Sequence, residues 1–267
     1  MRTLSIFKQL PAMVGMVHLQ SLPGSPGWKG DMGKVIDFAL KDAVALAEGG
    51  VDGVIVENFF DSPFTRGSVE PITVAAMTVC VREIRKAVKV AIGVNCLRND
   101  GVAAVSIATA AGAQFVRISN LTYAMVTDQG IIEGCAYEVS RLRSRINPDI
   151  TIFSDVMVKH AFPIGPMDIG VVARDTAHRG GTNALVISGT ETGAPIDVKD
   201  LKTVRDSLPD FPLASGSGVT PENLDEMLKY LDVIVVGTFF KEDSQVDRPV
   251  DSKRVKPFVQ RVHAART

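Results

Sequence analysis

The chain has 267 residues, of which 29 are basic and 30 acidic, so its formal charge is only -1. This balance argues against a nucleic-acid-binding protein, which needs clustered Lys and Arg, and against a membrane-surface protein, which needs a basic or strongly amphipathic face. With 46% hydrophobic and 22% charged residues, the composition is that of a folded globular protein rather than a disordered or collagen-like chain.

Three cysteines, Cys80, Cys96 and Cys135, are too few and too scattered for a disulfide framework or a Cys-x-x-Cys metal site. They indicate a reducing compartment. The first residues lack the long apolar run and small-residue cleavage site of a signal peptide, and no apolar run approaches the roughly 20 residues that cross a bilayer. We therefore expect a cytoplasmic protein without an integral membrane segment.

Short apolar runs alternate with longer segments along the whole chain. Most of the runs are rich in Val and Ile and apolar on both faces, as in parallel strands that are covered on both sides. We expect eight such strands, at residues 13–19, 53–58, 90–96, 115–119, 151–156, 184–189, 212–218 and 232–240.

The segments between the runs have apolar residues at helical spacing. After the first run, for example, Val35, Ala39 and Leu46 fall on one helical face, and Gly49 follows as a stop signal. We expect further helices near residues 71–88, 100–111, 134–146, 168–179, 198–208, 221–230 and 252–264.

Eight β-α units within one chain of this length predict a (β/α)8 TIM barrel, a closed barrel of parallel strands, that occupies residues 1–267 as a single domain. An open doubly wound sheet is the alternative, although the first loop lacks the Gly-x-Gly-x-x-Gly fingerprint of that fold. In a barrel, the carboxyl ends of the strands meet at one mouth, where active sites lie.

Two carboxylates, Glu57 and Asp155, directly follow apolar runs. Burial and neighbouring charges at such a position can shift a pKa, so either residue could act as a catalytic acid or base. The alternative is a buried ion pair with Arg117 or Lys159, which would hold a phosphate-binding cation in place.

Histidine and lysine residues near the same ends add further candidates. His18 ends the first run, and His160 follows the fifth; with Glu57 and Asp155 they could bind a divalent metal, although no His-x-His or His-x-x-x-His pair supports it, and no cofactor is otherwise expected. Lys159 could form a Schiff base, but it should stand in a loop where water keeps it protonated, so contact with a phosphate or carboxylate is the better expectation, and a plain solvated lysine is an equal alternative.

The most specific signal is the glycine-rich turn Ser215-Gly216-Ser217-Gly218 after the seventh run. Glycines let backbone amides approach an anion, and Thr220 with Pro221 should begin a helix beside the turn. Gly237 and Thr238 form a second small-residue turn after the eighth strand's core. Loops seven and eight form the usual phosphate cradle of such barrels, so we expect these two turns to bind phosphate.

Other residues near the strand ends are expected to contact a substrate. These are Asn58, Asn95, His160, Ser188 and Thr190. Two long loops, 20–33 with Trp28 and 120–134 with Tyr123, could close over the mouth as lids, although Trp28 could equally pack against the barrel rim.

Several segments resemble the BtpA family. They lie at the strand ends over nearly the whole chain: Met16-Val17-His18-Leu19, Leu22-Pro23-Gly24-Ser25-Pro26, Val56-Glu57-Asn58, Gly93-Val94-Asn95, Leu97-Arg98-Asn99-Asp100, Asp155-Val156, Lys159-His160 and Ser215-Gly216-Ser217-Gly218. The resemblance implies a barrel related to those that bind ribulose phosphate and similar ligands. The family is named for a factor needed to accumulate photosystem I.

The residues favour an enzyme that acts on a small phosphorylated molecule, a sugar phosphate or nucleotide-like compound, as an isomerase or lyase using acid/base chemistry. Glu57 and Asp155 would be base and acid, with Arg117 and Lys159 stabilising negative charge. The alternatives are a non-enzymatic assembly or stability factor for a membrane protein complex such as photosystem I, as the resemblance implies, and a metal-dependent lyase or hydrolase. A homo-oligomer is compatible with the sequence.

Overall fold

A computed structural model describes residues 2–266 and contains a closed barrel of eight parallel strands. The strand order is β1-β11-β10-β9-β7-β4-β3-β2, so neighbours around the barrel are also successive barrel strands along the chain. Their bounds are β1 Ala12–His18, β2 Gly53–Glu57, β3 Ala91–Asn95, β4 Phe115–Ile118, β7 Thr151–Asp155, β9 Ala184–Ile187, β10 Leu213–Ser215 and β11 Val233–Val236. Because β1 pairs with both β2 and β11, the predicted barrel is confirmed and the open-sheet alternative is wrong.

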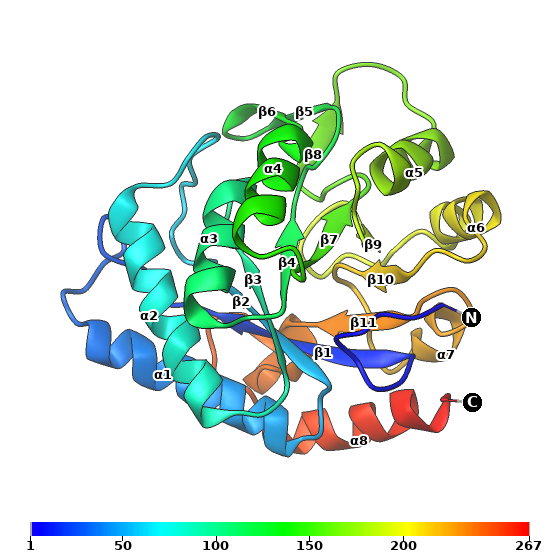
Figure 1. Cartoon of the computed structure of the whole chain (residues 1–267). Coiled ribbons are helices and arrows are strands. Elements are labelled where there is room, and N and C mark those ends of the chain that lie inside the picture. The colour runs from blue at the N-terminus through cyan, green and yellow to red at the C-terminus, as the bar shows by residue number, and fades with distance from the viewer. Residues whose placement is uncertain (1, 267) are drawn as a thin grey trace.

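The helices surround this barrel, as Figure 1 shows. They are α1 Met32–Glu48, α2 Pro71–Ala87, α3 Gly101–Ala111, α4 Ala136–Ile146, α5 Ile169–His178, α6 Val198–Ser207, α7 Leu224–Met227 and α8 Ser252–Ala264, with short 3-10 turns η1 Thr238–Phe240 and η2 Glu242–Ser244. Within residues 2–266, no helix is both long and apolar enough to cross a bilayer.

Local signals explain where the helices begin and end. The Asp31 carboxylate accepts a hydrogen bond from the Lys34 N–H at the start of α1, and α8 begins in the same way after Asp251. At the other end of the chain, Arg266 donates to the Pro11 carbonyl (3.0 Å), so the segment before β1 lies beside the end of α8.

The apolar core has two layers. Inside the barrel, the rings of Phe115 and Phe153 lie 5.1 Å apart, and Phe7 from the segment before β1 packs edge-on against both. A Cβ on Gly93 would lie 2.3 Å from the Phe115 ring, so this strand position requires glycine. The second layer fills the space between strands and helices. Burial on both faces explains why the strands are continuous apolar runs.

A second, antiparallel sheet of three short strands was not predicted. Its strands are β5 Ala124–Thr127, β6 Gly130–Glu133 and β8 Ala161–Pro163, in the order β6-β5-β8. The hairpin β5–β6 occupies the segment expected to be a lid loop after β4, whereas β8 follows β7. Both segments leave the carboxyl ends of barrel strands, so this sheet stands at the mouth of the barrel (Figure 1).

Candidate functional site

Two cavities lie at the carboxyl ends of the strands. The outer cavity, of about 890 Å³, is bordered by β3, the antiparallel sheet and the segment that follows β7. The cradle cavity, of about 210 Å³, is lined by the turns at residues 192–193, 216–220 and 236–239. Both cavities are lined by Glu57, Arg117, Lys159 and Thr192, so they meet at these residues.

The two predicted glycine turns border the cradle cavity together, and close packing explains the glycines. A Cβ on Gly216 would lie 2.0 Å from Ser188 Oγ and 2.7 Å from Arg117 Nη2. Gly218 has a φ of +74°, in the left-handed region that glycine accepts without strain. Thr238 also lines this cavity, and the Ser217 hydroxyl is buried without a hydrogen-bond partner.

The expected helix start at Thr220 and Pro221 is wrong. The helix α7 begins only at Leu224, and the Thr220 N–H donates to Asn223 Oδ1 (2.9 Å). The Asn223 amide in turn donates to the Gly218 carbonyl (2.9 Å). The side chain of Asn223 therefore shapes the turn, and no helix begins directly beside the glycines.

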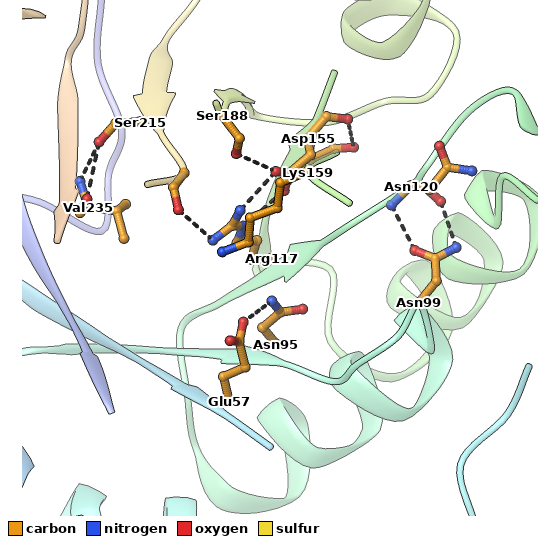
Figure 2. A network of polar contacts seen from close by, with 12 residues as sticks. Glu57, Asn95, Asn99, Arg117, Asn120, Asp155, Lys159, Ser188, Ser215 and Val235 are labelled. Atoms are coloured by element: carbon orange, nitrogen blue, oxygen red, sulfur yellow. Dashed lines mark hydrogen bonds and ion pairs between the residues drawn. The ribbon is translucent and has the colours of Figure 1, made fainter. Parts of the chain in front are cut away.

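Arg117, at the end of β4, is held by a bidentate ion pair with Asp155 at the end of β7. The Arg117 Nε and Nη2 atoms lie 2.9 and 2.8 Å from the two carboxylate oxygens of Asp155. Ser188 donates to one of these oxygens (3.0 Å), and Arg117 Nη1 donates to the Gly216 carbonyl (3.3 Å). Figure 2 shows the guanidinium between Asp155 and the cradle turn.

This ion pair bears on the two interpretations of Asp155, the catalytic acid and the ion-pair partner. Burial alone would lower the pKa of Arg117, but Asp155 and its hydrogen bonds raise this pKa above its ordinary value, so Arg117 stays charged. Because both oxygens of Asp155 contact Arg117, the geometry favours the ion-pair alternative over a free catalytic acid. Ser188 lines neither cavity and donates to Asp155, so the structure gives it a supporting contact, and its substrate contact stays a prediction.

Glu57 differs from Asp155 because it has no arginine or lysine partner within salt-bridge distance among the described residues. Its position in β2 is directly opposite Asn95 of β3, and the Asn95 amide donates to Glu57 Oε2 (Figure 2). Only 4% of Glu57 is exposed, yet it lines both cavities. This carboxylate is therefore oriented by a neutral group and faces the place where the cavities meet.

Lys159 lies in the loop after β7, as expected, but it is not a plain solvated lysine. It is half-buried and lines both cavities. Burial and then Arg117 lower its pKa, whereas Glu57 and Asp155 act in the opposite direction. Its backbone carbonyl accepts a hydrogen bond from Arg98 Nη2 (2.5 Å), which holds the segment after β7 against the mouth.

Arg98 is a site residue that our reading of the strand ends missed. It follows β3, is 5% exposed, and lines the outer cavity. Its only signal in the sequence is the run Leu97-Arg98-Asn99-Asp100, which resembles the BtpA family but does not follow an apolar strand directly. It adds a third cation to the mouth, beside Arg117 and Lys159.

The two histidines lie in different surroundings. His18 lines the cradle cavity, its Nδ1 is buried without a partner, and its ring packs on Phe59 at 4.6 Å. Burial, then Lys241, Lys159 and Arg117, lower the pKa of His18 well below its ordinary value, so its imidazole is neutral at pH 7. His160 lines the outer cavity and accepts a hydrogen bond from the Thr192 N–H (3.2 Å).

The described residues do not form the divalent-metal site that the sequence left open. Across residues 2–266, no group of three or more His, Cys, Asp and Glu side chains is arranged to hold a metal ion. Two of the four expected ligands explain this. Both oxygens of Asp155 bind Arg117, and His160 accepts a hydrogen bond from the Thr192 N–H.

The remaining predicted residues separate into two groups. Asn95 and Thr190 line the outer cavity. Asn58 lines neither of these cavities but borders a third one of about 150 Å³. Its Oδ1 accepts from the Leu97 N–H (2.8 Å) and its amide donates to Asp61 (3.1 Å), so it joins two loops, and its substrate contact stays a prediction. Trp28 packs against the core at the barrel rim, and lines neither cavity.

Sequence comparison assigns the chain to a family. The model of the BtpA family matches residues 9–264. The chain belongs to the BtpA family. It is 39% identical over 248 residues to the photosystem I biogenesis protein BtpA of Synechocystis sp., covering 93% of this chain and 86% of the relative. It is 44% identical over 254 residues to the uncharacterized protein TK2179 of Thermococcus kodakarensis, with 95% of each chain covered.

Comparison with solved structures shows the fold. Phosphoribosyl anthranilate isomerase from Thermus thermophilus superposes with a TM-score of 0.58 over 95% of this chain and 98% of the isomerase. The sequence identity is 12%, so this likeness concerns the barrel and not the residues of the site.

Proposed function

We propose that this BtpA-family barrel is an enzyme that acts on a phosphorylated small molecule by acid/base chemistry, as an isomerase or lyase. One observation carries the proposal. Both glycine turns border one small cavity that opens beside a buried carboxylate, Glu57, and this cavity contains two buried polar atoms without partners, Ser217 Oγ and His18 Nδ1. A buried polar atom without a partner is costly unless a ligand or water satisfies it.

The cradle cavity suits the phosphate group. Its volume of about 210 Å³ exceeds that of one phosphate, and Arg117 and Lys159 both border it. The Gly216 N–H already donates to the Ile187 carbonyl (2.8 Å), so the donors to a phosphate would come from Ser217 and from the amides of Gly218, Gly237 and Thr238. That a barrel of the same fold is named as an isomerase of a phosphoribosyl compound supports this assignment.

The reacting carbon would lie where the cavities meet. There Glu57 takes a proton from the substrate and returns it to a neighbouring carbon or to a leaving group, and Asn95 fixes the direction of the carboxylate. Arg117 and the Lys159 ammonium stabilise the anion that forms. In this scheme Asp155 is a positioning residue, because it acts through Arg117, and Ser188 supports Asp155.

Two measurements test this function. A thermal-shift screen of phosphorylated metabolites should find stabilising compounds, and inorganic phosphate should compete with them, because a ligand stabilises the native state by mass action. Once a substrate is found, Glu57→Gln should lower kcat by about 100-fold or more and leave binding intact. The proposal fails if phosphate does not compete, or if Glu57→Gln turns over normally.

The name of the Synechocystis relative supports a second candidate, an assembly factor for a membrane protein complex. Such a factor would use an outer surface, and the site at the barrel mouth would be dispensable. Expressed in place of the Synechocystis protein, the Glu57→Gln variant would then still support photosystem I accumulation. An enzyme whose product is required would lose this ability with the same substitution.

A further inference from the structure

An apolar row crosses the exposed face of the antiparallel sheet. Val126 of β5 pairs with Ile131 of β6 on one side and with Phe162 of β8 on the other. The neighbouring Met125 and Ile132 point to the opposite face, where they are buried with Val158. Phe162 is 74% exposed, so the sheet presents a large ring to solvent although its other face already supplies the local core.

Two members of the row face the site. Val126 and Phe162 line the outer cavity together with Phe64, whereas Ile131 does not line it. Apolar and aromatic side chains that gather at the wall of a cavity are typical of a ligand-binding groove.

A polar group borders this apolar wall. The turn between β5 and β6 brings Asp128 and Gln129 to the outer cavity. The Gln129 amide donates to Asp128 (2.5 Å), and its carbonyl end is buried without a hydrogen-bond partner. One wall of the cavity therefore combines an apolar face with an unsatisfied amide at its edge.

The wall is continuous with the cradle. The outer cavity is about 890 Å³ and meets the cradle cavity at Glu57, Arg117, Lys159 and Thr192. A small sugar phosphate with its phosphate in the cradle would fill the space near Glu57 and leave Val126 and Phe162 uncovered. A longer ligand would cover them.

We propose that the substrate is a phosphate monoester with a planar heteroaromatic ring at its far end, as in a nucleoside monophosphate, and that this ring packs on Val126 and Phe162 with its polar edge toward Gln129. This inference rests on the proposed function, because it takes the cradle as the phosphate site. Planar rings stack on aromatic side chains, and a ring N–H would satisfy the Gln129 carbonyl.

Calorimetric titration of matched ligands tests the inference. Ribose 5-phosphate and the four common ribonucleoside 5′-monophosphates differ only in the base. We expect at least one nucleotide to bind about ten-fold more tightly than ribose 5-phosphate. Phe162→Ala should remove most of this difference and leave ribose 5-phosphate binding unchanged. The matched control is Ile131→Ala, in the same row but outside the cavity, which should change neither affinity.

The outcomes separate this inference from the proposed function. If ribose 5-phosphate and inorganic phosphate both fail to bind, the phosphate site itself is wrong, and the inference falls with it. If ribose 5-phosphate binds and no nucleotide binds more tightly, only the ring subsite is wrong. If Phe162→Ala and Ile131→Ala both dissociate an oligomer in sedimentation and leave the affinity ratio intact, the row is an interface between copies of this chain, and the inference is overturned.

Discussion

Arg117 lies near the end of β4 and Lys241 follows β11, and each pairs with a buried aspartate, but their surroundings differ. Lys241 follows β11, pairs with Asp42 of α1, and lines neither cavity; both side chains are fully buried. Arg117 pairs with Asp155 and lines both cavities. The comparison teaches that a buried ion pair can act on a ligand only where one of its members borders a cavity, as Arg117 does.

The pair of Lys241 and Asp42 joins the last loop to the first helix. Asp42 also accepts a hydrogen bond from the Val250 N–H (2.7 Å), and the Lys241 backbone carbonyl accepts one from Arg254 Nη1 (2.7 Å). No described group other than Asp42 forms an ion pair with Lys241. Loss of the carboxylate therefore leaves a buried cation without a counter-charge.

The largest expected effect is on stability, from Asp42→Asn. The uncompensated Lys241 should lower the free energy of unfolding by about 3–5 kcal/mol, measured by urea denaturation. The double variant Asp42→Asn with Lys241→Met removes both charges and should regain most of the loss. If the single variant unfolds like the wild type, the pair is not the structural connection described above.

Asp155→Asn should affect stability less and ligand binding more. The loss of one charged acceptor should lower the free energy of unfolding by about 2 kcal/mol. This is less than for Asp42→Asn because water in the cavities can still solvate Arg117. Phosphate affinity should fall by about ten-fold or more, since a misaligned guanidinium no longer points at the cradle. Asp42→Asn, measured on the folded fraction, should leave phosphate affinity unchanged; equal losses in the two variants would contradict the comparison.

Ser188→Ala gives the matched control for Asp155. The substitution removes one hydrogen bond to the carboxylate and preserves the ion pair. The free energy of unfolding should therefore fall by about 1 kcal/mol, and phosphate affinity should fall only slightly. A loss of affinity as large as that of Asp155→Asn would show that Ser188 itself contacts the ligand, as we first expected.

The fold was largely predictable from the sequence, and the partners of the polar residues were not. Strands buried on both faces are continuous apolar runs, and residues such as Asp31 and Gly49 mark the helix ends locally. The strands β5, β6 and β8 were missed because each has only three or four residues, and because β8 pairs with β5 across a long stretch of chain.

The roles at the strand ends depend on distances that the sequence does not contain. Glu57 and Asp155 look alike in sequence, since each ends an apolar strand. In the structure, one carboxylate contacts a neutral amide and the other contacts an arginine. The position of Lys159 likewise depends on Arg98, which is 61 residues away along the chain. These contacts separate a catalytic candidate from a positioning residue.

The smallest expected effect connects the two ion pairs through His18. After burial, Lys241 lowers the pKa of His18 the most, followed by Lys159 and Arg117, so His18 senses cations of both regions. Its ordinary pKa is 6.5. Below that pH the unfolded chain binds a proton that native His18 does not accept. The free energy of unfolding should therefore fall as the pH decreases below 6.5, by up to about 1.4 kcal/mol per pH unit from this residue.

His18→Gln should remove that part of the slope in urea denaturation at a series of pH values. Lys241→Met should reduce it more than Lys159→Met does, because Lys241 is the stronger influence; the reverse order would mean that His18 belongs to the cradle alone.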